Sequence, residues 1–389
     1  MQPTFKLSQK GLAWLRTGHL WIYRDDVAEV PANVESGAVA RVASSTGAFV
    51  AQAFYSARGK IALRVISFEE APVDRAFLRS LLLGARERRP NALPASAAFR
   101  LVSAEGDLFP GLIIDVYAGH YVVQSMIAGT DRIMPELTEL LDELFAPLSI
   151  TLRCDLAVRE MEGLDREKKT LKGGPQREVM VEEGPVKYLA DLWEGQKTGA
   201  YLDQQENRIR AGRWAHGRGL DAFCFHGLFA LHLARGCSEV VALDGSAAAI
   251  ERVKRNSGLN GLDNIAARKA NVFDEFAAME KAREKFDVIV LDPPPFAKSR
   301  KDLAGARKGY ADLNRRAMNL LRPRGVLLTY SCSYNLSAPA FLDVLRSSAA
   351  DARRRLRILE QQTQAPDHPI LLSMPETHYL KGFALEAMD

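Results

Sequence analysis

The second half of the chain alternates short apolar runs with helix-like segments, and this pattern constrains the fold more than any other sequence feature. It predicts an α/β domain in which helices cover both faces of a largely parallel sheet. The runs expected to be buried strands are residues 220–223, 239–243, 265–268, 287–291 and 326–330. Because ligands of open α/β sheets bind at the carboxyl ends of the strands, the residues that follow these runs are the first candidates for a functional site.

Two of the strand ends carry reactive groups. Asp292 follows the run 287–291 and precedes three prolines, and Cys332 follows the run 326–330 between two serines. We expect the carboxylate and the thiol to be neighbours at one edge of the sheet. A buried structural cysteine is the alternative for Cys332. The pair suggests an enzyme that modifies a nucleobase through a cysteine nucleophile.

The other strand ends resemble a cofactor site. Gly227 lies in the first strand-to-helix turn, where a glycine lets a ligand approach the backbone. The turn has a single glycine, which favours a ligand without a pyrophosphate. Asp244 ends the second strand about twenty residues later, where an acid can bind ribose hydroxyls. Asn271 follows the third strand and is placed to contact an adenine. With Asp292, these residues point to S-adenosylmethionine.

The 389 residues are enough for two or three domains. Residues 1–68 are predicted to form a β-rich unit with a helix over 12–20 and strands at 39–42, 49–55 and 61–66. Residues 73–185 are predicted to form an α+β unit, with an exposed loop at 162–176. The α/β domain follows over 186–389.

Composition narrows the possible partners. The net charge of +4 and the basic cluster Lys298, Arg300, Lys301, Arg307 and Lys308 suit a nucleic-acid backbone. A second basic group, 353–357, fits a solvated helix face equally well. Four scattered cysteines without a Cys-x-x-Cys pair argue against structural zinc and against disulfides. No apolar stretch approaches a membrane span, and the N-terminus lacks a secretory pattern, so we expect a cytoplasmic protein without membrane contact.

Further motifs are spread over the whole chain. They are residues 19–23, 104–112, 195–204 with Asn207 and Arg208, 286–296 with Lys298, 309–310, 331–333, 367–369, 375–376 and 379–383. With these motifs the chain resembles the PUA-containing 23S ribosomal RNA cytosine-5 methyltransferases of the RlmI type. The resemblance implies an N-terminal PUA RNA-binding domain (1–68), a central α+β domain (73–185) and a C-terminal Rossmann-like methyltransferase domain (186–389).

The resemblance also implies a reaction and a set of site residues. Cys332 would attack carbon 6 of a cytosine, so that carbon 5 takes a methyl group from S-adenosylmethionine, and Asp292 would hold the ring. The expected cofactor contacts are Gln204, Phe223, Cys224, Gly227, Asp244, Ser246, Asn271, Asp292 and Pro293, with the Cys224 side chain a structural part of the turn. The expected RNA contacts are Phe296, which would stack on an extruded base, Lys298, Arg300 and Lys301. The partner would be large-subunit ribosomal RNA rather than the mature ribosome, and a homodimer is compatible with the sequence.

The first turn departs from the family pattern. Leu228 stands where the family usually has a second glycine, and His226 stands where it has a small residue.

Three alternatives to a cytosine-5 methyltransferase stay open. The chain could be a uridine-5 methyltransferase, an exocyclic-amine methyltransferase for which Cys332 is dispensable, or an RNA-binding assembly factor with a degenerate cofactor fold. Leu228 is the feature that favours the last of these.

Overall fold

The structure is a computed structural model that describes residues 2–90, 94–296 and 302–389. The chain divides into two compact units. Unit 1 comprises Met1–Val181, Ala190–Leu202 and Pro366–Thr377, and unit 2 comprises Glu182–Leu189, Asp203–Ala365 and His378–Asp389. The expected division into three domains, with boundaries near residues 70 and 185, stays a prediction. Across the three described ranges, no helix is both long and apolar enough to span a bilayer.

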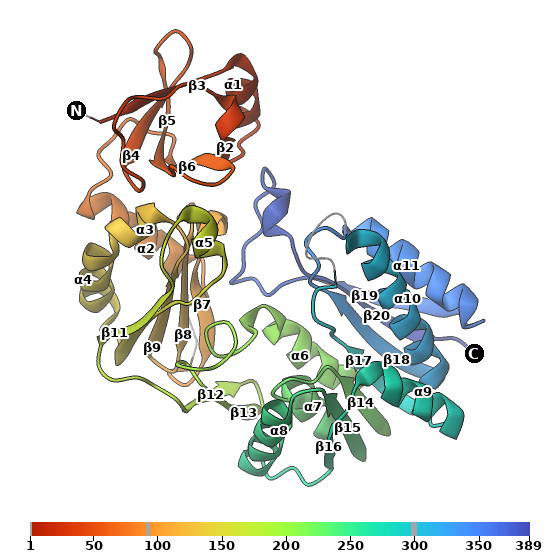
Figure 1. The fold of residues 1–389 in the computed structure, drawn as a ribbon. Helices are drawn as coiled ribbons and strands as arrows, with labels where there is room; N and C mark the ends of the chain where they lie inside the picture. The colour runs from red at the N-terminus through yellow and green to blue at the C-terminus, as the bar shows by residue number, and fades with distance from the viewer. Residues whose placement is uncertain (1, 91–93, 297–301) are drawn as a thin grey trace. The chain divides into compact units, whose positions relative to one another are not determined.

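The first sheet of unit 1 has six strands in the order β2-β6-β5-β4-β1-β3 (Figure 1). The strands are β1 (Thr4–Leu7), β2 (Trp21–Tyr23), β3 (Val27–Glu29), β4 (Val39–Ala43), β5 (Phe49–Tyr55) and β6 (Ile61–Ser67). The three strands predicted here are confirmed as β4, β5 and β6. The helix expected over 12–20 is wrong in its bounds, because α1 (Gln9–Leu15) ends early and Gly18 turns the chain at φ +85° toward β2.

The second sheet of unit 1 has five strands in the order β11-β10-β9-β8-β7. They are β7 (Ala98–Ser103), β8 (Leu112–Tyr117), β9 (His120–Ser125), β10 (Ser149–Cys154) and β11 (Glu167–Lys172). The accompanying helices are α2 (Arg75–Glu87), α3 (Ala128–Arg132), α4 (Met134–Phe145) and α5 (Val158–Glu162). Leucines of α2 and α4 pack on the apolar face of this sheet and bury its core. This part of the chain is the predicted α+β arrangement.

The exposed loop expected over 162–176 is wrong, because β11 lies inside it. β11 is an edge strand that pairs antiparallel with β10. Its sequence, Glu-Lys-Lys-Thr-Leu-Lys, is mostly charged and most of its residues are half-buried. An edge strand with charged side chains has no apolar alternation, so the period that reveals buried strands is missing.

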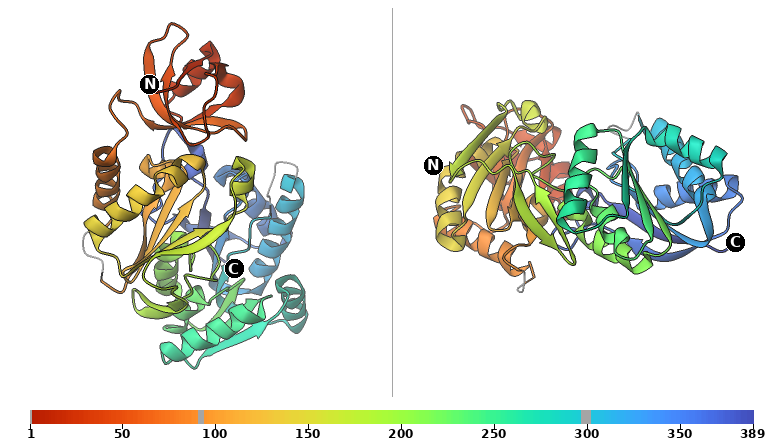
Figure 2. Two further views of the ribbon diagram at one scale, coloured as in Figure 1. Left: turned by 60° about the vertical axis from the view of Figure 1, so that its left-hand side comes forward. Right: turned by 90° about the horizontal axis from the view of Figure 1, so that it is seen from below.

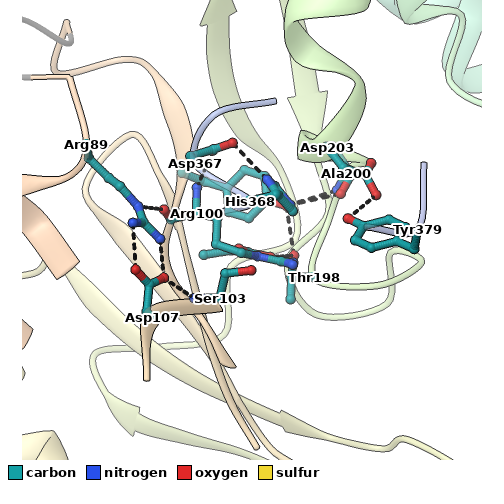
Figure 3. Close-up of polar contacts among 12 residues, drawn as sticks. Arg89, Arg100, Ser103, Asp107, Thr198, Ala200, Asp203, Asp367, His368 and Tyr379 are labelled. Atoms are coloured by element: carbon teal, nitrogen blue, oxygen red, sulfur yellow. Dashed lines mark hydrogen bonds and ion pairs between the residues drawn. The ribbon is translucent and has the colours of Figure 1, made fainter. Parts of the chain in front are cut away.

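Buried ion pairs connect β7 with β8 and with the segments next to it, and a hydrogen bond connects β7 with the distant residue Asp367 of unit 1 (Figure 3). The guanidinium of Arg89 forms an ion pair with Asp107, and that of Arg100 donates two hydrogen bonds to Asp115, at 2.7 and 2.9 Å. The backbone N–H of Arg100 donates to Oδ2 of Asp367 at 2.7 Å, and Oδ1 of Asp367 lies 2.7 Å from Nδ1 of His368. The motif 367–369 is therefore part of the core of unit 1.

Unit 2 is built on a seven-stranded sheet in the order β16-β15-β14-β17-β18-β20-β19. The strands are β14 (Arg218–Ala222), β15 (Glu239–Asp244), β16 (Ile265–Lys269), β17 (Phe286–Leu291), β18 (Leu321–Ser331), β19 (Leu356–Gln362) and β20 (Lys381–Ala387). The first five run parallel, and β20 pairs antiparallel with both β18 and β19. Numbered within the sheet, the order is 3-2-1-4-5-7-6. The five predicted strands are confirmed, while β19 and β20 were not predicted.

Helices cover both faces of this sheet, as the views in Figures 1 and 2 show. They are α6 (Gln205–Ala211), α7 (Leu228–Ala234), α8 (Ala247–Leu259), α9 (Val272–Ala282), α10 (Leu303–Leu320) and α11 (Ala338–Asp351). The strand residues alternate between two cores. Leu220, Ile289 and Leu327 face α9, α10 and α11, whereas Val240, Val288 and Leu328 face α6, α7 and α8. The doubly wound fold predicted from the alternation is confirmed.

The remaining short elements connect these sheets. β12 (Val179–Glu183) and β13 (Val186–Ala190) form a two-stranded sheet. In the part of the chain that the structure describes, short 3₁₀-helices are η1 (Arg24–Asp26), η2 (Ala104–Asp107), η3 (Leu202–Gln204), η4 (Gly212–Trp214) and η6 (Pro375–Thr377). Of these, η3 leads directly into α6 and brings Gln204 into unit 2, which matters for the site described next.

Candidate active site

The order of the strands places a ligand-binding edge between β14 and β17. These strands are hydrogen-bonded neighbours, but the helix after β14 covers one face of the sheet and the helix after β17 covers the other. Diverging connections of this kind leave a crevice at the carboxyl ends of the two strands, where ligands of open α/β sheets bind. All five strand ends singled out in the sequence lie along this edge.

The turn after β14 is built from backbone conformations that few residues adopt. Phe223, Phe225 and Gly227 have positive φ angles of 63°, 47° and 75°. A Cβ at Gly227 would lie 2.9 Å from a methyl carbon of Val253, so both its conformation and its surroundings require glycine. Phe223 belongs to this turn, because β14 ends at Ala222. The tight turn lets a ligand approach the chain closely.

The two departures from the family pattern cause no strain in this turn. Leu228 is the first residue of α7, so its side chain is attached to right-handed helical backbone and is buried. His226 is buried and stacks on the ring of Phe225, with ring centroids 3.5 Å apart. Burial, and secondarily the charge of Arg252, lowers the pKa of His226 to about 3, so the imidazole is neutral. Neither residue prevents the turn from forming.

Asp244 at the end of β15 holds this turn in place. Its Oδ2 accepts a hydrogen bond from the backbone N–H of Phe225 at 3.0 Å, and its Oδ1 accepts one from Ser246 at 2.8 Å. Ser246 in turn caps α8, since its hydroxyl accepts from the N–H of Ala249. The half-buried carboxylate keeps further lone pairs that can accept hydrogen bonds from a ligand.

Asp221 lies beneath the same turn and was not singled out in the sequence. It is 1% exposed, its Oδ2 accepts from the N–H of Ala230 at 2.9 Å, and its Oδ1 has no partner among the residues that the structure covers. Burial, reinforced by the charges of Asp292 and Asp244, raises the pKa of this carboxyl to about 8. An orphaned buried oxygen next to the turn fits a site that a polar ligand completes. The donors and acceptors at this edge therefore suit S-adenosylmethionine.

Two further predicted cofactor residues have structural roles: Asn271 caps a helix, and Cys224 packs in the core. Asn271 is exposed after β16 and caps α9, since its Oδ1 accepts from the N–H of Phe273 at 3.0 Å. Cys224 is buried in the core beside α7, and burial raises the pKa of its thiol well above the usual value. A neutral, buried thiol is unreactive, which agrees with the structural role expected for the Cys224 side chain.

Asp292 at the end of β17 is held by a chain of amide side chains. The Nε2 of Gln204 donates to Oδ2 of Asp292 at 3.1 Å, and the Nδ2 of Asn207 donates to Oε1 of Gln204 at 2.7 Å. The same Nδ2 of Asn207 also donates to the carbonyl of Thr363 at 3.0 Å. Gln204 and Asn207 are both buried. These contacts fix the orientation of the Asp292 carboxylate.

Cys332 lies next to the turn that contains Asp292. Its Sγ is 3.9 Å from the carbonyl oxygen of Pro293, and the side chain is half-buried. The thiol and the turn after β17 are thus neighbours, as the two strand ends predicted. Beyond Cys332, the hydroxyl of Ser333 lies 3.0 Å from that of Tyr310 on α10.

Phe296 packs edge-on against Tyr310, with ring centroids 4.8 Å apart, and remains half-buried. The packing observed is that of a core residue at the rim of the site. Lys298, Arg300 and Lys301, the expected phosphate contacts, lie outside the described residues.

The model of the S-adenosylmethionine-dependent methyltransferase family matches residues 153–375 of this chain. The chain belongs to this family. A second family model, for a PUA-like domain, matches residues 5–68, the segment that forms the six-stranded sheet of this methyltransferase. The two matches confirm the predicted fold class.

Full-length relatives are more specific. The methyltransferase is 39% identical to "Ribosomal RNA large subunit methyltransferase I" of Tolumonas auensis and 37% identical to the protein of that name from Vibrio cholerae, in both cases over 100% of each chain. It therefore belongs to their family. Among solved structures, it matches a SAM-dependent methyltransferase from Streptococcus mutans with a TM-score of 0.84 at 20% identity, over 99% of this chain and 100% of that one. A methyltransferase complexed with SAH matches with a TM-score of 0.85, also at 20% identity and with the same coverage.

Sequence reasoning missed two charged residues of the methyltransferase's site, Asp221 and Lys381. Asp221 lies one residue before the end of the buried strand β14, and a carboxylate in such a run was the available signal. Lys381 stands within the motif 379–383, but its strand, β20, was not predicted. Its position beside Cys332 depends on the antiparallel pairing of β20 with β18.

Proposed function

We propose that this methyltransferase transfers a methyl group from S-adenosylmethionine to carbon 5 of a cytosine in 23S ribosomal RNA, through a covalent adduct with Cys332. The observation that carries the proposal is the position of the Cys332 thiol, 3.9 Å from the carbonyl oxygen of Pro293 in the turn that begins with Asp292. Transfer to an exocyclic amine would require no thiol at this position.

The chemistry explains why a thiol is needed. Carbon 5 of a pyrimidine is a poor nucleophile. Addition of the Cys332 thiolate to carbon 6 forms an S–C bond and moves the electron pair of the 5,6 double bond onto carbon 5. When bound, S-adenosylmethionine supplies an electrophilic methyl group on a sulfonium. Loss of the carbon 5 proton to a base, with elimination of the thiolate, then restores the aromatic ring and the free cysteine.

We assign Asp292 to the recognition of the cytosine ring. Its carboxylate would hold N3 and the exocyclic amine of cytosine and so favour the protonated ring, in which carbon 6 is more electrophilic toward the Cys332 thiolate. Gln204 already donates to Oδ2 of Asp292, which keeps the carboxylate in one orientation before the substrate arrives. Phe296, at the rim of the site, would stack on the extruded base.

The cofactor would occupy the turn after β14 and the ends of β15 and β16. In this assignment Phe223, Cys224 and Gly227 contribute the wall of the turn, Asp244 binds the ribose hydroxyls, and Asn271 contacts the adenine. Ser246 shapes the end of β15, and Gln204, Asp292 and Pro293 border the methyl-donor side. The relatives' names support large-subunit ribosomal RNA as the substrate, and the PUA-like segment supports an RNA partner. A homodimer, cytoplasmic localisation and a substrate other than the mature ribosome stay predictions.

Replacement of Asp244 tests the cofactor assignment. Asp244→Ala should weaken S-adenosylmethionine binding about ten- to a hundredfold, because a hydrogen bond to a charged group contributes about 1.5–3 kcal/mol. Asp244→Asn keeps an acceptor for the N–H of Phe225. Its affinity for S-adenosylmethionine should lie between those of Asp244→Ala and the wild-type protein. Asp263→Ala removes an exposed acid just before β16, at the opposite end of the strands, and should bind normally. Unchanged affinity of Asp244→Ala in calorimetry would move the ribose contact elsewhere.

RNA containing 5-fluorocytidine tests the covalent step. Fluorine at carbon 5 leaves no proton to remove, so the adduct with Cys332 should persist through denaturing electrophoresis when S-adenosylmethionine is supplied. Peptide mass spectrometry should locate it at Cys332. A persistent adduct with 5-fluorouridine instead would favour the uridine-5 activity, and a methylated exocyclic amine without any adduct would contradict the proposal.

A further inference from the structure

Lys381 is a buried lysine whose surroundings are unusual for a cation. It is the first residue of β20, lies opposite Ser331 of β18, and is 4% exposed. Its Nζ donates to the carbonyl oxygens of Ser333 and Tyr379, at 2.7 and 2.8 Å. Both acceptors are neutral, and they use two of the three donors of the ammonium group.

No carboxylate forms an ion pair with Lys381 within the ranges 2–90, 94–296 and 302–389. The fully buried Arg208 of the same unit differs in this respect, because its guanidinium donates to both oxygens of Glu183, at 2.7 and 2.5 Å. An ammonium taken out of water without a counter-charge is unfavourable, so buried lysines are normally paired or lose their proton. A group of opposite charge is therefore expected near Lys381.

Among the described residues, Cys332 is a neighbour of Lys381 that can take a negative charge. Lys381 donates to the carbonyl of Ser333, the next residue in the chain, and Tyr379 packs with Cys332 against the same apolar core. Burial lowers the pKa of Lys381 to about 8, and the charge of Cys332 acts in the opposite direction. At neutral pH the lysine therefore keeps most of its positive charge next to the thiol.

We propose that Lys381 is a positioning residue that stabilises the thiolate form of Cys332 and so prepares it for attack. The proton of the thiol leaves to solvent, the ammonium keeps its own proton, and the two groups become a partly buried ion pair. The use of the thiolate as a nucleophile rests on the proposed function. The pairing of Lys381 with Cys332 does not, because it needs neither RNA nor cofactor. A nearby cation is a general way to keep a cysteine ionised at neutral pH.

Other titratable groups near Lys381 and Cys332 are either neutral or negatively charged. Burial raises the pKa of Tyr310 to about 12, so this phenol is neutral. Burial and the charge of Lys381 lower the pKa of His378, which leaves that imidazole uncharged. Asp292 is the nearby anion, and it disfavours a second negative charge. Lys381 is a cation placed to offset both Asp292 and the partial burial of the thiol.

The rate of alkylation of Cys332 by iodoacetamide, measured against pH and located by peptide mass spectrometry, tests the proposal. In Lys381→Met the pH of half-maximal rate should rise by about 1–3 units, the range by which an opposite charge shifts a neighbouring group. The midpoint is the better readout, because the intrinsic reactivity of a thiolate also changes with its basicity. Cys154, Cys224 and Cys237 should react slowly, since burial raises the pKa of each thiol.

Two variants separate charge from structure. Lys381→Arg keeps a cation, so its pH of half-maximal alkylation of Cys332 should stay close to that of the wild-type protein. Lys285→Met removes a lysine that also donates to a backbone carbonyl, that of Asn319, but lies just before β17 at the opposite end of the strands. In Lys285→Met, the pH of half-maximal alkylation of Cys332 should equal that of the wild-type protein. An unchanged midpoint in a folded Lys381→Met protein would overturn the proposal.

A reciprocal measurement covers the case in which Lys381→Met fails to fold. In protein labelled with ¹³C at the lysine ε-carbon, the titration midpoint of Lys381 should fall in Cys332→Ser, because the thiolate that favours the ammonium is gone. An unchanged lysine midpoint would also reject the pairing. If Cys332→Ala instead kept full methyl transfer, the proposed function would fail while both titrations still reported whether the pair exists.

Discussion

Cys332→Ala should lose methyl transfer while binding S-adenosylmethionine with wild-type affinity. Removing a covalent nucleophile lowers turnover by several orders of magnitude, and we expect a loss of about 10⁴-fold or more. The cofactor should still bind because most of the residues assigned to it lie at the ends of β14, β15 and β16, and Cys332 touches the turn after β17 only at the backbone carbonyl of Pro293, which the substitution leaves in place. The measurements are single-turnover methylation of ribosomal RNA and calorimetric titration of the cofactor.

Cys237→Ala is the matched control for this variant. Cys237 is a buried thiol whose Sγ contacts the carbonyl of His216, and burial raises its pKa to about 11. Its replacement removes one sulfur atom away from the strand ends and should leave the turnover rate unchanged. Wild-type-like turnover by Cys332→Ala would reject the nucleophile and favour transfer to an exocyclic amine.

Glu183→Gln should produce the largest loss of stability in unit 2. The Glu183 carboxylate is 1% exposed, accepts two hydrogen bonds from Arg208 and lies 3.0 Å from Nε2 of His232. Glutamine has the same shape but no charge, so the buried guanidinium would lose its counter-ion. Breaking a buried pair from one side costs about 3–5 kcal/mol. The midpoint of thermal unfolding should fall by about 6–20 °C.

The neighbouring residue provides the control. Glu182 pairs with Lys187 at 3.4 Å near the surface, and Glu182→Gln should change stability by less than about 1 kcal/mol. Equal effects of the two substitutions would show that the Glu183–Arg208 pair adds nothing beyond a surface contact.

The same pair predicts a pH dependence of stability. Although burial acts to raise the pKa of Glu183, the charge and hydrogen bonds of Arg208 prevail and lower it to about 2. A carboxylate with a depressed folded-state pKa stabilises the protein above the unfolded-state value, near 4.3, and this contribution disappears as the pH falls toward 2. Wild-type stability should therefore decline over this window more steeply than that of Glu183→Gln, as followed by urea unfolding.

Local sequence patterns account for the parallel half of the sheet and for the reactive groups at its edge. Strand cores are visible because buried strands are apolar and rich in β-branched residues, and their ends are visible where Asp244, Asp292 and Cys332 interrupt the pattern. Resemblance to a family added Gln204, which lies between β13 and β14, outside any predicted strand, and so gave no local signal. The placement of Cys332 beside the turn after β17 agrees with this reading, while the roles of these residues await the experiments above.

The tertiary structure decided what depends on pairing between distant segments. β11 is a strand only because β10 offers its edge, and β20 enters the sheet between β18 and β19, which sets Lys381 opposite Ser331. The motif 367–369 lies in unit 1 because Asp367 accepts from the backbone of Arg100. By itself, the sequence determined which segments are buried and which chemistry stands at their ends. Which of those ends meet is a matter of long-range backbone registers and buried charge pairs, which no local period encodes.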